Sequence, residues 1–223
     1  MLCFVDDGSI DNTKEILFRL KELYPNLVQI VSYEINQGKA EAVRIGMLKC
    51  LKKYDCNIIG YIDADLAVSL NDTVSLIRYI NKDVELCFYS RIDNGSNIIK
   101  AKIHRKLIGK IIRFFINNLF LIKYRDTQCG CKIFSRSLSI QVFQEKFIST
   151  WLFDIEIFLR VREIFTQDIL KIKVREIPAK KWIDIGKSKV KISYFFNLWI
   201  DMMKIYMKYY NTIKNKSNNL KAK

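Results

Sequence analysis

The sequence of 223 residues predicts an α/β fold in which a mostly parallel sheet is flanked by helices. Two observations predict it. As far as residue 90, short apolar runs rich in β-branched and aromatic residues alternate with segments of helical periodicity, which is typical of β–α–β crossovers. The apolar runs also contain few polar positions, which favours strands covered on both faces of the sheet.

The elements of this first part follow from the hydrophobic pattern. Strands are expected at 2–6, 28–33, 57–62 and 84–89, and helices at 11–23, 38–53 and 71–81. In the first helix, for example, Ile16, Leu20 and Leu23 share one face.

After residue 95 the alternation weakens. A long basic and apolar helix is expected at 98–122, a strand at 169–177 and a closing helix at about 192–213. The length suits one domain, which we place at 1–213. The Lys- and Asn-rich segment 214–223 is expected to be a disordered basic tail.

Polar groups follow each of the first four strands. The segments are Asp6-Asp7-Gly8-Ser9, Asn36-Gln37-Gly38-Lys39, Asp63-Ala64-Asp65 and Ser90-Arg91. In parallel sheets, ligands bind beyond the carboxyl ends of the strands. Adjacent carboxylates repel one another and resist burial, so two such motifs at one edge favour a binding site over solvated loops.

Asp63 and Asp65 are the candidate metal ligands. Their hard oxygen ligands at this spacing suit Mg²⁺ or Mn²⁺ held together with the phosphates of a substrate. Aspartates after a strand also serve as helix caps, a role that Asn71 or Asp72 fills equally well here.

The net charge of +15 is concentrated in two regions. Residues 99–136 carry ten Lys and Arg against Asp126 alone, and residues 179–223 carry eleven Lys against two aspartates. Such regions suit an anionic membrane, a nucleic acid or solvent. The sequence contains no recognised nucleic-acid motif, and a carboxylate-lined edge repels phosphate without a metal.

The expected helix at 98–122 mixes Lys and Arg with Ile and Phe. This composition suits a helix in the headgroup region of an anionic leaflet, and it also suits a core helix with a solvated basic face. No uncharged apolar run reaches the ~18 residues that a membrane span requires, and no secretory signal begins the chain. The six cysteines lie mostly in apolar periodic segments, as reduced buried thiols do, and Cys129 and Cys131 are read as packing residues.

Together, several segments resemble the family 2 glycosyltransferases of the GT-A fold. "VDDGSIDNT", "NQGKAEAVRIG" and "DAD" match the family's motifs, and "DAD" corresponds to its D-x-D metal site. "RDTQCGCKIFSR" and "WLFDIEIFLR" resemble a subgroup, the polyprenyl- and dolichyl-phosphate sugar synthases, with wording nearest to the dolichyl-phosphate β-glucosyltransferases. The family places one more strand before VDDGS, and this chain begins without it.

The resemblance implies metal-dependent, inverting transfer of a hexose from a nucleotide sugar, with UDP-glucose favoured, to a polyprenyl or dolichyl phosphate. The enzyme would be attached peripherally to the cytoplasmic face of a membrane. Asp6, Asp7, Gly8, Ser9 and Lys39 would bind the nucleotide, Asp63 the ribose or the metal, and Asp65 the metal, Mg²⁺ or Mn²⁺. The alternatives are transfer to a growing surface glycan and an inactive fragment that keeps the fold.

On the acceptor side, the resemblance singles out Arg91, Asp126 and Lys132. Arg91 and Lys132 would hold acceptor phosphate or leaving-group oxygens, or else are ordinary surface cations. A sugar hydroxyl acceptor needs a carboxylate base, for which Asp126 is the candidate. A lipid phosphate is already anionic, so Asp126, Gln128, Asp154 and Glu156 would then mainly orient other groups.

Overall fold

The computed structural model describes residues 1–91, 98–100, 113–183 and 193–214. The described elements run in the order β1 (Leu2–Asp7), α1 (Thr13–Leu23), β2 (Val28–Tyr33), α2 (Lys39–Lys53), β3 (Ile58–Ile62), α3 (Leu70–Leu76), the 3-10 turn η1 (Ile77–Tyr79), β4 (Leu86–Ser90), β5 (Ile98–Lys100), β6 (Cys131–Ser135), α5 (Arg136–Phe143), α6 (Phe153–Ile164), α7 (Gln167–Lys173), β7 (Val174–Pro178), β8 (Lys181–Ile183) and α8 (Ser193–Lys208). A further helix covers 113–120.

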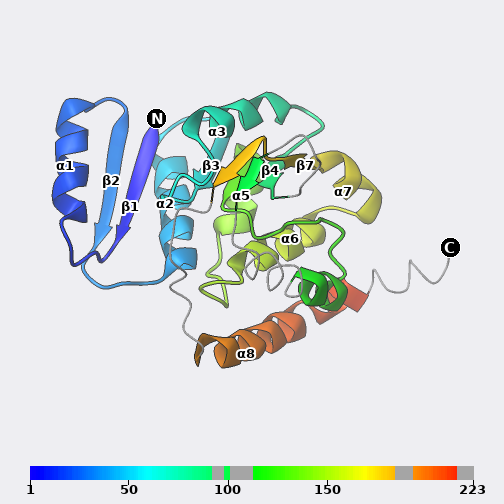
Figure 1. Cartoon of the computed structure of the whole chain (residues 1–223). Helices are drawn as coiled ribbons and strands as arrows, with labels where there is room; N and C mark the ends of the chain where they lie inside the picture. Colours follow the sequence, from blue (N-terminus) through cyan, green and yellow to red (C-terminus); the bar gives the residue numbers. More distant parts are fainter. Residues whose placement is uncertain (92–97, 101–112, 184–192, 215–223) are drawn as a thin grey trace.

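The first two strands form a parallel pair between two helices. β1 and β2 run in register from Leu2 opposite Val28 to Asp7 opposite Tyr33. Figure 1 shows this pair between α1 and α2. Helix α2 lies close to β1, because a Cβ on Gly46 would stand only 2.7 Å from the Val5 Cγ2 atom.

Four other strands form the larger sheet, in the order β3-β6-β4-β7. β6 is antiparallel to both of its neighbours, and β7 is parallel to β4. β3 and β4 therefore run in the same direction and end at the same edge. Among the described residues no ladder joins β1 to β3, and α2, which contacts both strands, connects the two sheets.

The main core lies between the larger sheet and helices α5 and α6. β4 is fully buried along its whole length, as expected for a strand with neighbours on both edges. α6 is buried on every side through its first ten residues, including two arginines. Arg160 donates to the carbonyl oxygens of Val142, Glu145 and Lys146. The Nη2 atom of Arg162 donates to the Phe120 carbonyl oxygen, whereas its buried Nη1 atom has no hydrogen-bond partner among the described residues.

The predicted elements up to β4 are confirmed apart from their ends, and α3 stops at Leu76 with η1 after it. Two later predictions are wrong in part. Residues 169–173 belong to α7 instead of a strand, and the strand begins only at Val174, opposite Leu86. Residues 98–100 form β5, paired with β8, instead of the start of a helix, and only 113–120 of that segment is helical among its described residues.

The closing helix begins at Ser193, and after Tyr209 a helical segment reaches 214. Apart from Lys214, the predicted tail lies outside the described residues. Five residues of the basic segment also lie outside them: Lys102, His104, Arg105, Lys106 and Lys110. None of the described helices is both long and apolar enough to cross a bilayer.

Helix α8 is apolar on two faces. Met202, Ile205 and Tyr209 are buried in the core. A second set of large apolar side chains is exposed, and it continues onto the 113–120 helix. The ring centroids of Phe115 and Trp199 lie 6.4 Å apart. We call this set the α8 surface; it comprises Phe114, Phe115, Trp199, Ile200, Met203, Met207 and Tyr210. In Figure 1, α8 runs along the lower outer side of the molecule.

Candidate active site

The end of β1 is fixed by hydrogen bonds to both of its carboxylates. Asp6 is buried and accepts from the Ser9 backbone N–H at 3.1 Å and from the Ser32 hydroxyl at 2.8 Å. Burial raises the pKa of Asp6, but these hydrogen bonds outweigh it and hold that pKa below its usual value. Asp7 accepts from the backbone N–H groups of Gln37, at 2.7 Å, and Gly38, at 2.8 Å.

Two glycines make this close approach possible. Gly8 has a φ of 73° and Gly38 a φ of 89°, a region that residues with a Cβ rarely adopt. A Cβ on Gly8 would lie 2.8 Å from the Asn36 nitrogen, and one on Gly38 would lie 2.9 Å from the Thr150 methyl group. The turn after β1 therefore stacks against the loop before α2, and it brings the start of α2 to the strand end.

Lys39, the first residue of α2, connects this turn to the end of β3. Its Nζ atom lies 2.7 Å from Oδ1 of Asp63, and both side chains are about one-third exposed. Asp65 is exposed, and its Oδ1 atom accepts from the Ala67 N–H at 3.0 Å. The start of α2 therefore links the end of β1 to the end of β3.

The charges gathered at this edge shift the pKa values of Asp63 and Lys39. Burial raises the pKa of Asp63, which Lys39 opposes and the nearby Asp154 and Asp65 reinforce. Burial works to lower the pKa of Lys39, but the same carboxylates outweigh it and raise that pKa. Groups whose pKa values are shifted by specific charges in this way are common at functional sites.

Gly130 is a site residue that the sequence analysis did not single out. Its carbonyl oxygen accepts from the Asp63 N–H at 2.7 Å, and a Cβ on Gly130 would lie 2.0 Å from Oδ2 of Asp63. Only a glycine leaves room for that carboxylate. The sole sequence signal is its position within the "DTQCGCK" segment that carries the family resemblance.

Beneath this edge lies a buried ion pair between Lys132 and Asp154. The Lys132 side chain is fully buried, and its ammonium group donates to Asp154 and, at 2.7 Å, to the Cys129 carbonyl oxygen. The Tyr61 hydroxyl donates to the same Asp154 oxygen at 2.5 Å. Lys132 is thus no surface cation, and it holds Asp154 at the start of α6.

Arg91 follows β4 and is held by Asp126. Its Nε and Nη2 atoms each lie 2.7 Å from an Asp126 oxygen, a bidentate pair, and the Trp182 ring centroid lies 5.2 Å from its guanidinium carbon. Burial raises the pKa of Asp126, but Arg91 outweighs it and holds that pKa below its usual value. Glu176 accepts from the backbone N–H of Asp126 at 2.9 Å and fixes the loop.

Within the described part of the chain, the side chains of Glu156 and Gln128, two predicted orienting residues, form no hydrogen bond or ion pair with Arg91, Asp126, Lys132 or Asp154. Glu156 accepts from the backbone N–H groups of Ile148, at 2.8 Å, and Ser149, at 3.1 Å, and so shapes the loop before α6. Gln128 is half-buried in the turn between Asp126 and Gly130.

The donor set at β3 fits a divalent metal that completes its coordination with substrate. Among the described residues no group of three or more His, Cys, Asp or Glu side chains forms a metal cluster. Mg²⁺ commonly binds one or two carboxylates together with substrate phosphates, instead of an all-protein cage. Asp63 and the exposed Asp65 supply that number of carboxylates.

The fold resembles solved glycosyltransferases of the GT-A type. Glucosyl-3-phosphoglycerate synthase from Mycobacterium tuberculosis, in complex with Mn²⁺, UDP and glucosyl-3-phosphoglycerate, aligns with a TM-score of 0.61 and 14% identity over 96% of this chain and 68% of that one. The same enzyme in complex with UDP alone gives a TM-score of 0.59 over 96% and 69%. The fold is therefore GT-A.

The chain belongs to glycosyl transferase family 2, whose model matches residues 2–143. Similar proteins include the dolichyl-phosphate beta-glucosyltransferase ALG5A of Trichomonas vaginalis, 29% identical over 92% of this chain and 60% of the relative. The dolichyl-phosphate beta-glucosyltransferases of Saccharomyces cerevisiae and Homo sapiens are 29% and 26% identical, over 86% and 87% of this chain and 59% and 64% of the relatives. The chain spans about three-fifths of the length of these relatives.

Proposed function

We propose that this domain transfers glucose from UDP-glucose to dolichyl phosphate, or a related polyprenyl phosphate, at a membrane surface. The observation that carries the proposal is the meeting of Asp7, Lys39 and Asp63 at one edge of the fold. The similarity to dolichyl-phosphate beta-glucosyltransferases supports the choice of sugar and acceptor.

On the donor side, the end of β1 receives the nucleoside. Asp6 and Asp7, held in place by Ser9, Ser32 and the α2 N-terminus, accept hydrogen bonds from base and ribose. Lys39 moves between Asp63 and the diphosphate oxygens. Asp63 and Asp65 would hold Mg²⁺ or Mn²⁺, which when bound would neutralise charge on the departing diphosphate.

On the acceptor side, an anionic phosphate oxygen of the lipid attacks the anomeric carbon of the sugar. The bond from that carbon to the diphosphate oxygen breaks, UDP leaves, and the configuration inverts. No proton has to be removed from the acceptor, so Asp126 serves to fix Arg91, whose guanidinium faces the acceptor phosphate. Lys132 and Asp154 act as positioning residues because they are buried beneath the site.

The α8 surface supports action at a membrane. Exposing the apolar solvent side of a helix to water costs free energy unless another surface covers it. Trp199 and Tyr210 are typical of the membrane interface, and the exposed Lys204 and Lys208 lie on the same helix, as suits anionic headgroups.

The test is transfer of radiolabelled glucose into an organic-extractable lipid. The protein is incubated with UDP-[¹⁴C]glucose, Mn²⁺ and dolichyl phosphate, with dolichol as the matched acceptor that lacks the phosphate. Label is expected in dolichyl-phosphate glucose and absent with dolichol. Label in neither acceptor, or equal label in both, would overturn the proposal.

A further inference from the structure

The side of β1 that faces α2 carries Cys3, Val5 and Asp7, because alternate residues of a strand share a face. Two contacts fix how this face meets the helix. Asp7 accepts from the Gly38 N–H at 2.8 Å, and Val5 lies against Gly46. The strand and the helix therefore run antiparallel, with the N-terminal end of β1 beside the C-terminal part of α2.

This register brings two cysteines opposite one another. From Val5 to Cys3 the strand moves about 6.6 Å, and from Gly46 to Cys50 the helix moves about 6 Å in the matching direction. The two steps are nearly equal, so Cys3 and Cys50 stand face to face. The two thiols are near enough that each shifts the pKa of the other.

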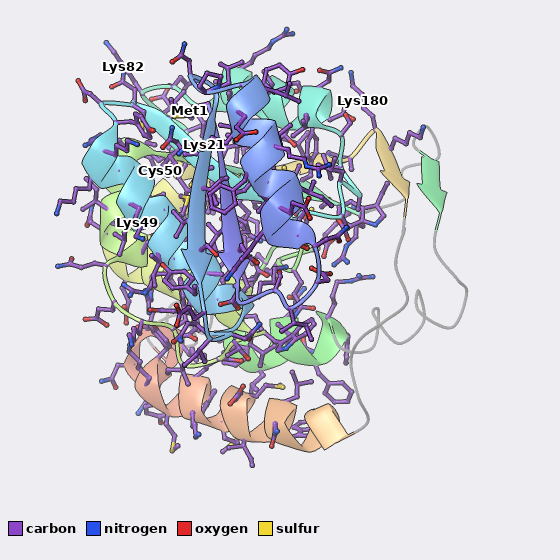
Figure 2. The ribbon with its side chains drawn as sticks, turned by 90° about the vertical axis from the view of Figure 1, so that its left-hand side faces the viewer. Met1, Lys21, Lys49, Cys50, Lys82 and Lys180 are labelled. Atoms are coloured by element: carbon purple, nitrogen blue, oxygen red, sulfur yellow. The ribbon has the colours of Figure 1, made fainter. Side chains whose placement is uncertain are left out.

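The surroundings make one of the two thiols reactive. The neighbouring Cys50 thiol lowers the pKa of Cys3 to about 7 against the effect of burial, and Lys49 and Lys53 lower it further. Cys3 and burial raise the pKa of Cys50, so Cys50 keeps its proton when Cys3 loses its own. Both residues are half-exposed, whereas Cys87, Cys129 and Cys131 are buried. Figure 2 shows Lys49 and Cys50 on α2, on the side of the molecule that carries β1 and β2.

We propose that Cys3 and Cys50 form a redox site that closes reversibly to a disulfide. With hydrogen peroxide as oxidant, the Cys3 thiolate attacks one peroxide oxygen, the O–O bond breaks, and the second oxygen leaves as water after taking a proton. The Cys50 thiol then attacks the resulting sulfenic sulfur, and a second water leaves. Two thiols thus supply two electrons, one peroxide is reduced to two waters, and a dithiol reductant reverses the change.

The crosslink would tie together parts of the fold that the described strand ladders leave unjoined. It joins β1 to α2, and α2 is the helix that contacts both sheets. It also closes a long loop, which restricts the unfolded chain. Because the site at Asp7 and Lys39 lies at the opposite end of β1 and α2, the expected effect is on stability.

The test treats the purified protein with an equimolar amount of hydrogen peroxide at pH 7.5 and maps the digested peptides by mass spectrometry. We expect a Cys3–Cys50 crosslinked peptide, two hydrogens lighter than its parts, that dithiothreitol releases. The same oxidised protein should unfold at a Tm roughly 5 °C or more above the reduced protein. This comparison needs no variant.

Variants assign the residues. Cys56→Ser removes another half-exposed cysteine and should leave the crosslink and the Tm rise intact. Cys50→Ser should abolish both. Crosslinks that involve other cysteine pairs instead, or oxidation that leaves Cys3 and Cys50 uncrosslinked, would overturn the proposal.

Discussion

The Nζ atom of Lys39 lies 2.7 Å from Oδ1 of Asp63, which joins the first residue of α2 to the residue after β3. No strand ladder among the described residues spans these two parts of the fold. The lysine also offsets the charge of a carboxylate that stands near Asp65 and Asp154. The ion pair thus connects the two halves of the candidate site.

The close approach of Gly130 to Asp63 allows the site to be tested by adding one methyl group at residue 130. Gly130→Ala places a Cβ 2.0 Å from Oδ2 of Asp63, so the carboxylate must move. We expect the affinity for UDP with Mn²⁺ to fall at least tenfold, as measured by calorimetry. The double variant Gly130→Ala/Asp63→Ala has no carboxylate to displace, and its Tm should match that of Asp63→Ala alone. A Gly130→Ala protein with normal affinity would contradict this reading.

The ion pair between Lys132 and Asp154 predicts a stability effect. Lys132→Met leaves Asp154 buried without its cation, and removing one partner of such a pair costs about 3–5 kcal/mol. Urea unfolding of the variant should show that loss. The double variant Lys132→Met/Asp154→Leu removes both charges, so it should regain a large part of the lost free energy. Equal losses in the two variants would show that the pair itself is unimportant.

Asp126 predicts an acid-dependent stability. Burial opposes its ionisation, but Arg91 dominates and holds the pKa below the usual 3.8. A lowered pKa gives stability that is complete above pH 3.8 and is lost as pH falls through the lower, folded-state value. We expect the free energy of unfolding of the natural protein to drop more steeply from pH 4 to pH 2.5 than that of Asp126→Asn. The free energy of unfolding is measured by urea titration at each pH. An equal pH dependence in the natural protein and in Asp126→Asn would contradict the lowered pKa of Asp126.

The α8 surface predicts binding to vesicles. Replacing Trp199, Met203 and Met207 by Gln removes exposed apolar area, and cosedimentation with vesicles containing phosphatidylserine should weaken at least tenfold. The matched control, Ile169→Gln/Ile172→Gln, changes exposed apolar residues of α7 outside this surface and should bind normally. If the natural protein does not sediment with the vesicles, the membrane proposal is wrong.

The local hydrophobic pattern was enough to predict the secondary structure of the first part of the fold, as far as β4. The strands and helices up to β4 follow from hydrophobic periodicity, and parallel topology then brings the residues after the strands together. The link from Asp7 to Asp63 runs instead through Gly38 and Lys39 at the start of α2, because no ladder among the described residues joins β1 to β3.

Pairing between distant segments was not predictable in this way. β6 lies between β3 and β4 although it follows them by some forty residues or more, and its antiparallel direction has no local signal. For the same reason the buried position of Lys132 and the contact of Gly130 with Asp63 emerge only from the fold. Residues 169–173 show that the local pattern can also mislead, since a run with apolar residues that suits a strand forms α7 in the structure.

The central claim is that Asp63 and Asp65 bind a divalent metal together with a nucleoside diphosphate. Its most direct test is calorimetric titration with UDP, with and without Mn²⁺, of the natural protein, of Asp65→Asn and of Asp83→Asn, an exposed aspartate outside the site. We expect Mn²⁺-dependent UDP binding in the natural protein and in Asp83→Asn, and its loss in Asp65→Asn at an unchanged Tm, because Asp65 is exposed. UDP binding that is equally tight without Mn²⁺, or that survives in Asp65→Asn, would contradict the claim.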